Sequence, residues 1–94
     1  MEHEIMHVKG RQVEGYVIPL QSCNLTFIKS ESGILACGAI DVSALDKFEI
    51  PAARISGVTT LDDLMKGSIK EVNSCAAERG VKTGMNGEEA LEFL

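Results

Sequence analysis

The stretch from Gly33 to Val42 constrains the fold more than any other part of the chain. It reads Gly-Ile-Leu-Ala-Cys-Gly-Ala-Ile-Asp-Val, an apolar run with a glycine in its middle and one carboxylate near its end. An apolar run that opens at a glycine is typical of a strand buried on both faces. We therefore predict a strand over residues 34–41, in which Gly38 marks a bulge or a close approach of another backbone.

Alternating side chains and turn residues predict the neighbouring strands. Residues 4–8 alternate polar and apolar side chains, Lys9-Gly10 supplies a turn, and residues 11–20 continue with β-branched and aromatic side chains. This pattern predicts an N-terminal β-hairpin within residues 1–20. Two further strands are expected over residues 25–30 and 53–58.

Capping residues predict the helices of the second half of the chain. Thr60, Ser68 and Asn86 each precede apolar side chains at helical spacing. Ser68 with Glu71 three residues later has the pattern of a capping box. The helix that begins there is expected to end at Gly80, because glycine readily adopts the left-handed conformation that terminates helices.

The order of these elements predicts an α+β domain. About five mostly antiparallel strands come before two or three C-terminal helices, and we expect the helices to pack on one face of the sheet. The chain has 94 residues, enough for a single domain over residues 1–94 with one modest core. Because only 4% of the residues are aromatic, that core must be mostly aliphatic.

Charge and cysteine content exclude several classes of partner. The net charge is −5 and the nine basic residues are scattered, which argues against binding to nucleic acid. No apolar stretch approaches the roughly 20 residues that a membrane span needs, so no membrane association is predicted. The three cysteines, Cys23, Cys37 and Cys75, show no CxxC spacing and are expected to be reduced thiols in a cytoplasmic protein.

Several short motifs occur together over nearly the whole chain. They are Asn24-Leu25, Gly33, residues 37–42, Ala53-Arg54, Gly57-Val58, Gly80, Gly84-Met85 and Gly87. On these residues the chain resembles the YunC-like proteins of bacteria and archaea, whose domain is of unknown function (domain 1805). The family's Cys-Gly-Ala-Leu-Asp motif appears here with Ile40 for leucine, and its Ala-Gly-Arg-Ala segment has Ala53 for glycine. The resemblance implies a small α+β fold whose N-terminal β region is associated with tetramerisation, and no established activity.

Five residues are candidates for a functional site: Cys37 and Asp41 for catalysis, and Asn24, Gly38 and Arg54 for ligand binding. Asp41 either caps the helical turn that follows, pairs with Arg54, or acts as a general base. Cys37 is either a small buried core residue or a nucleophile. Arg54 alternatively offers its planar fork to a carboxylate or phosphate ligand. Asn24 either forms an Asx-turn or contacts a substrate.

No metal site and no particular cofactor are predicted. His3 and His7 are four residues apart, but their neighbourhood provides no obvious third ligand. Glycines precede the final helix at positions 80, 84 and 87, yet no lysine-serine or lysine-threonine pair follows them, so the Walker motif is absent.

The sequence leaves three functions open. The first is a small cytoplasmic homo-oligomeric domain, a tetramer through its N-terminal strands, that binds a small ligand or a protein partner. The second is a thiol- or carboxylate-dependent enzyme in which Cys37, Asp41 and Arg54 meet in a cleft. The third is a purely structural component of an assembly. The residues alone do not decide whether the protein is an enzyme.

Overall fold

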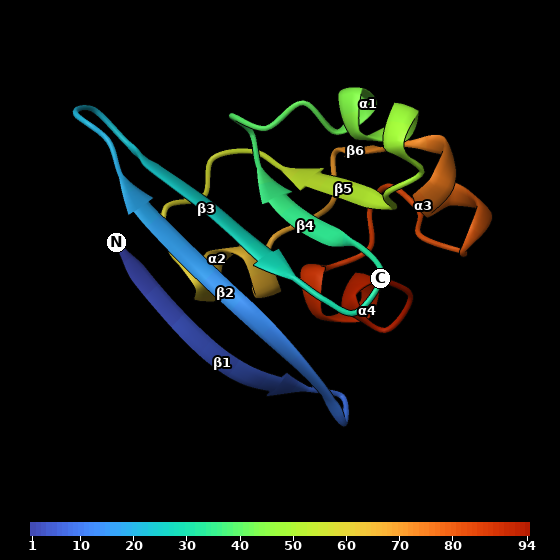
Figure 1. Cartoon of the computed structure of the whole chain (residues 1–94), viewed down its shortest axis with the longest axis horizontal. Helices are drawn as coiled ribbons and strands as arrows, with labels where there is room; N and C mark the ends of the chain where they lie inside the picture. Colours follow the sequence, from blue (N-terminus) through green and yellow to red (C-terminus); the bar gives the residue numbers. More distant parts are fainter.

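The computed structural model describes the whole chain, residues 1–94, and its centre is a six-stranded sheet (Figure 1). The strands lie side by side in chain order, from β1 to β6. All neighbouring strands are antiparallel except β4 and β5, which are parallel. The bounds of the strands are β1 Glu2–Val8, β2 Arg11–Pro19, β3 Asn24–Lys29, β4 Ile34–Cys37, β5 Ala52–Ile55 and β6 Glu71–Val72.

Short helices cover both faces of the sheet. They are α1 Val42–Leu45, the 3-10 helix η1 Asp46–Phe48, α2 Leu61–Lys66, α3 Ser74–Glu78 and α4 Gly87–Leu91. The C-terminal helices α2 and α4 pack on one face, which we call the inner face, and α1 lies over β5 and β6 on the opposite, outer face (Figure 1). The predicted α+β class is therefore confirmed. The helix α1 also packs on the second face of the sheet, over β5 and β6.

The main core lies between the inner face and the helices. Its largest fully buried side chains are aliphatic: Ile28, Leu35, Ile55, Leu64, Ile69, Leu91 and Leu94. No aromatic side chain belongs to this cluster, as the composition predicted. Burying one such side chain contributes about 1.5–3 kcal/mol relative to leaving it exposed.

The N-terminal hairpin is confirmed. β1 and β2 pair continuously from Glu2 opposite Val17 to Val8 opposite Arg11. The two turn residues, Lys9-Gly10, have φ angles of 54° and 80°. Two consecutive positive φ angles are typical of a type I′ turn, whose twist matches that of the strands it joins.

The strand predicted over residues 34–41 is too long. β4 ends at Cys37, and the chain turns there, because the amide of Ile40 donates to the carbonyl of Cys37 at 3.2 Å. Gly38 therefore lies in a turn and not in a strand bulge. The physical reason is Asp41, whose side chain binds the amides of the following helical turn and so draws the backbone out of the sheet.

The helix predicted from Ser68 to Gly80 is wrong in its first half. Residues 71–72 form β6 at the edge of the sheet, and the helix begins only at Ser74. Asn73 supplies its N-cap in place of Ser68. Gly80 follows the helix with a φ of 102°, the left-handed conformation that the sequence predicted. The predicted caps of the other two helices, at Thr60 and Asn86, are confirmed.

The side-chain amide of Asn73 makes four hydrogen bonds and joins three segments of the chain. The residue is only 5% exposed. Its Oδ1 accepts from the amides of Ala52 at 3.1 Å and Ala76 at 2.9 Å. Its Nδ2 donates to the carbonyls of Val42 at 3.0 Å and Ile50 at 2.8 Å. Since an amide has two donors and an oxygen that accepts twice, every hydrogen-bonding position of this side chain is used.

Asn73→Ala should be strongly destabilising. The substitution leaves four backbone groups without their partner in the interior, so we expect the free energy of unfolding to fall by about 3 kcal/mol. Urea denaturation followed by circular dichroism measures this change. Asn86→Ala is the matched control, since it removes one exposed capping bond and should lose only about 1 kcal/mol. Equal losses in the two variants would contradict the role of Asn73.

Candidate functional site

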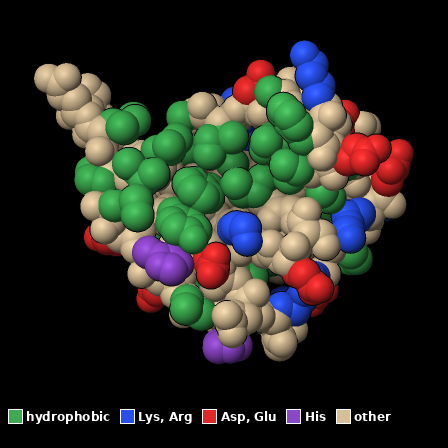
Figure 2. All heavy atoms as spheres, viewed as in Figure 1, with side chains coloured by type: hydrophobic (Ala, Val, Ile, Leu, Met, Phe, Trp, Pro, Cys, Tyr) green, Lys and Arg blue, Asp and Glu red, His purple; other side chains and the backbone are tan.

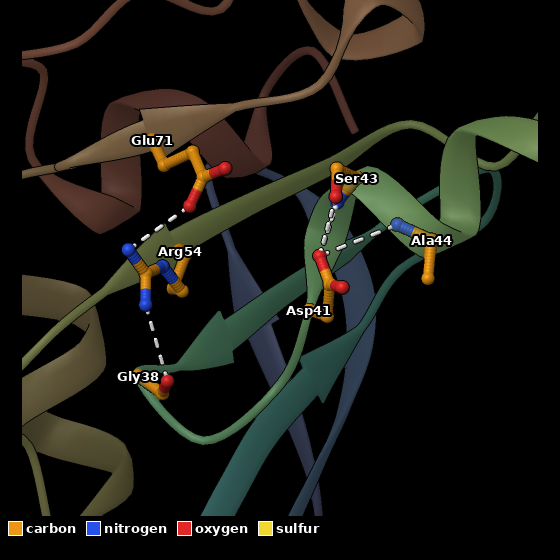
Figure 3. Close-up of polar contacts among 6 residues, drawn as sticks. All are labelled: Gly38, Asp41, Ser43, Ala44, Arg54 and Glu71. Carbon is orange, nitrogen blue, oxygen red and sulfur yellow. Dashed lines mark hydrogen bonds and ion pairs between the residues drawn. The ribbon is translucent and has the colours of Figure 1, made fainter.

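The turn after β4 brings Gly38 close to Arg54 (Figure 3). Arg54 lies in β5, and its side chain is 33% exposed on the outer face. Its Nη1 donates to the carbonyl of Gly38 at 3.2 Å, and its Nη2 lies 2.9 Å from Oε1 of Glu71, its neighbour across the sheet. The Nε of the same guanidinium is buried and has no hydrogen-bond partner. Arg54 thus fastens the turn after β4 to the edge strand β6.

Asp41 caps α1. One of its carboxylate oxygens accepts from the amide and the hydroxyl of Ser43, at 3.0 and 2.6 Å, and from the amide of Ala44 at 3.4 Å. The hydroxyl of Ser43 is the largest cause that lowers the pKa of Asp41, and the charge of Arg54 adds the least. Of the interpretations offered by the sequence, capping is confirmed. Pairing with Arg54 is wrong, because Arg54 pairs with Glu71 instead.

Cys37 lies away from these polar groups. The residue is 3% exposed and sits opposite Ile55, a member of the main core. Since side chains alternate along a strand, Cys37 faces the inner side while Ala36, opposite Arg54, faces the outer side. The structure therefore does not bring the thiol together with Asp41 and Arg54, and a role of Cys37 as a nucleophile stays a prediction.

Asn24 lies at a second location. As the first residue of β3, it donates from Nδ2 to the carbonyl of Thr59 at 3.1 Å and so ties the strand to the loop before α2. It lines a shallow hollow between β1 and α2, with the carboxylates of Glu2, Glu4 and Asp62 nearby. Neither Gly38 nor Arg54 lines this hollow, so the candidate ligand-binding residues do not form one site.

A polar cluster around Asp46 was missed in the sequence. Its carboxylate in η1 accepts from the hydroxyl of Ser74 and, at 3.1 Å, from the amide of Cys75. The hydrogen bond with Ser74 is the largest cause that lowers the pKa of Asp46. The pKa of the Cys75 thiol is raised, chiefly by a side-chain hydrogen bond to the same Asp46 carboxylate and then by burial. The thiol is therefore held in its protonated, weakly nucleophilic form. No local pattern could reveal this cluster, since 28 residues separate Asp46 from Ser74.

The outer face of β1 to β4 carries a bare patch of apolar side chains. Strand alternation and register place the following residues on that face, all of them partly or fully exposed: Ile5, Tyr16, Ile18, Leu25, Phe27 and Ile34. Figure 2 shows the patch as a continuous apolar area, and we call it the outer apolar face. The covering helix α1 contacts β5 and β6 instead.

Three aromatic rings cross the outer apolar face from strand to strand. His3 stacks on Tyr16 with ring centroids 4.6 Å apart, and Tyr16 stacks on Phe27 at 4.9 Å. The stack fixes three side chains in place on a surface that no helix covers.

No group of three or more His, Cys, Asp or Glu side chains is arranged to hold a metal ion. No helix is long and apolar enough to cross a membrane.

The cap at Asp41 should make the protein less stable in acid. Because the pKa of Asp41 is lowered by folding, its carboxylate stabilises the folded state above the unfolded pKa of about 3.9, and this contribution is lost as the pH falls through the lower folded value. The free energy of unfolding, measured in urea at several pH values, should decline below about pH 4.5. The decline should be shallower in Asp41→Asn and in Ser43→Ala, and an unchanged slope in both would contradict the prediction.

Comparison with known proteins gives a consistent match. The family described as "Domain of unknown function (DUF1805)" matches residues 36–94, which include Gly38, Asp41 and Arg54. The uncharacterised protein YunC of Bacillus subtilis strain 168 is 33% identical over 88 residues, which cover 89% of this chain and 87% of that protein.

A solved structure has the same fold. The crystal structure of a protein of unknown function, TA1206 from Thermoplasma acidophilum, superimposes with a TM-score of 0.92. The match covers 97% of this chain and 89% of that chain, at 24% sequence identity. The two sequence matches confirm the resemblance noted from the motifs: the chain belongs to the DUF1805 family of YunC-like proteins.

Proposed function

We propose that this protein works as a cytoplasmic homo-oligomer, a tetramer in its assembled form, which associates through its N-terminal strands. The single observation that carries the proposal is the outer apolar face, which no element of its own chain covers. The cytoplasmic location is supported by the three cysteines, which are all free thiols.

The apolar character and exposure of the outer apolar face support association. Ile5 is 56% exposed, and the other members of the face are partly exposed. Contiguous apolar patches larger than a few hundred Å² are rare on monomers and mark interaction surfaces. A second copy of the chain carries the same patch, and two identical patches can cover each other about a two-fold axis. Association would also add buried apolar area to a chain of 94 residues, whose own core is small.

Fewer observations support the hypothesis that the protein is an enzyme. Cys37 is buried on the inner face, whereas Arg54 projects from the outer face. Asp41 uses its carboxylate to cap α1, and its lowered pKa makes it a weak base. A site built from these three residues would require the chain to rearrange around β4.

Arg54 supports a second candidate function, the binding of an anionic ligand. A guanidinium offers five donors in a planar fork that matches carboxylate and phosphate groups. Here one nitrogen has no partner, and Glu71 occupies one side of the fork with a side chain that is itself 42% exposed. A phosphate or carboxylate ligand would bind by taking the place of the Glu71 carboxylate.

The role of the outer apolar face can be tested by placing a charge on it. The wild-type protein should have a mass in solution four times the 10.1 kDa of one chain, measured by light scattering after size-exclusion chromatography. Ile18→Glu should lower this mass, because a carboxylate buried in an apolar contact is strongly unfavourable. Phe93→Glu is the control, since it adds the same charge beside Gly80, away from the outer face. A monomeric wild type would disprove the proposal.

The anion site predicts a thermal shift with inorganic phosphate. If phosphate binds at Arg54, it should raise the melting temperature relative to chloride at equal ionic strength, because a ligand of the folded state stabilises it by mass action. The shift should be larger in Glu71→Gln, which frees the guanidinium, and absent in Arg54→Met. Equal shifts in all three proteins would show that phosphate acts elsewhere.

A further inference from the structure

The free edge of β1 offers a second surface for association. The strand has seven residues, pairs with β2 without a bulge and has no neighbour on its other side. In a hairpin closed by a two-residue turn, the residues flanking the turn, Val8 and Arg11, exchange both of their backbone hydrogen bonds. Alternate residues of β1 therefore direct their backbone groups away from β2, and these are His3, Ile5 and His7. Such an unpaired row is a template for another strand.

We infer that β1 pairs antiparallel with β1 of a second copy, with the two-fold axis at Ile5, so that His3 lies opposite the partner's His7, and that acid releases this contact. The inference rests on the proposed function, because it supplies the second interface that a tetramer with two-fold symmetry requires. The outer apolar face supplies the first.

Backbone geometry selects this register. With the axis at Ile5, each of the three residues whose backbone groups point to the free edge lies opposite a partner residue whose backbone groups do the same. Every free backbone donor and acceptor of these residues is then used. An axis at Glu4 sets His7 opposite the partner's Met1, which lies outside β1. It also sets Glu4 against the partner's Glu4, and like charges directly opposite each other are destabilising. An axis at Met6 leaves His3 without a partner.

The side chains of β1 fit the same register, which is the reason to expect a second copy as the partner. On the inner side, Glu4 lies opposite the partner's Met6 and Glu2 opposite the partner's Val8, so no carboxylate faces another. On the outer side, Ile5 meets the partner's Ile5. The outer apolar face then continues from one sheet into the other, since Ile5 belongs to it and is 56% exposed.

The histidines make this contact sensitive to pH. Histidine gains its charge between about pH 8 and pH 5. In the paired edge, each His3 lies directly opposite the partner's His7 at both ends of the contact. Protonation therefore sets like charges against each other across the interface.

Within the same chain, no carboxylate lies directly opposite either histidine across the strands. On β2, Tyr16 stacks on His3, and Gln12 lies opposite His7. Glu14 lies opposite Ile5, diagonal to both histidines, and accepts from the hydroxyl of Tyr16 at 3.2 Å. Glu88 of α4 lines the same hollow as His7. Lys9 follows in the turn and adds a positive charge, which pairs at 3.8 Å with Glu92.

Cysteine cross-linking tests the register. Glu4→Cys, Ile5→Cys and Met6→Cys are made in the full chain with Cys23→Ser and Cys75→Ser, while Cys37 stays because it is buried. Oxidised glutathione should link Ile5→Cys into dimers at least about tenfold faster than the other two, because cysteines offset across the strands lie about 7 Å apart, beyond disulfide reach. Faster linking at position 4 or 6 would overturn the register.

Mass measurement at two pH values tests the acid release and separates it from the proposed function. The wild-type mass should fall by about half between pH 7.5 and pH 5.5, while His3→Gln/His7→Gln keeps its mass, with circular dichroism confirming that both stay folded. An oligomer that cross-links at position 5 but ignores pH overturns the acid release. An oligomer at pH 7.5 with no link at position 5 overturns the edge pairing alone, and a monomer at pH 7.5 overturns both proposals.

Discussion

The fold depends on the buried amide of Asn73 more than on any other polar group. Parallel strands need a crossover connection, and here residues 38–51 make it as a turn, α1 and η1. The Asn73 amide binds this connection near both ends, at the carbonyls of Val42 and Ile50, and also binds the first amide of β5. A single side chain thus fixes α1 on the outer face, at the β5 end of the sheet.

This placement divides the outer face into two unlike halves. Over β5 and β6 the face is covered by α1, and Ala52 of β5 is fully buried. Over β1 to β3 nothing covers the face, although the side chains there are larger and more apolar. A domain normally buries both apolar faces of a sheet against other layers. The bare half therefore has no second layer within one chain, and this absence is the basis of the proposed association between chains.

The elements that the sequence predicted are those with local causes. Lys9-Gly10 closes its hairpin through its own φ angles, and Thr60, Asn86 and Asp41 cap helices through amides two or three residues away. Hydrophobic pattern also located five of the six strands.

The elements that the sequence did not predict have distant causes. β6 is two residues long and exists only because β5 lies beside it, so residues 71–72 carried no strand signal. The partner of Arg54 and the environment of Cys75 likewise depend on segments 17 and 29 residues away. The outer apolar face was hidden for a similar reason, because alternation shows two faces but not which of them the helices will cover.

The order of the strands has a consequence for synthesis. Since neighbours in the sheet are also neighbours in the chain, β1 to β3 can pair using only residues 2–29. Contacts this local form quickly, whereas translation adds only about 5–20 residues per second. The open edge and the bare face therefore leave the ribosome before α2 and α4 exist. At that stage the inner side of these strands is also bare, because the helices that will pack on it have not yet been made.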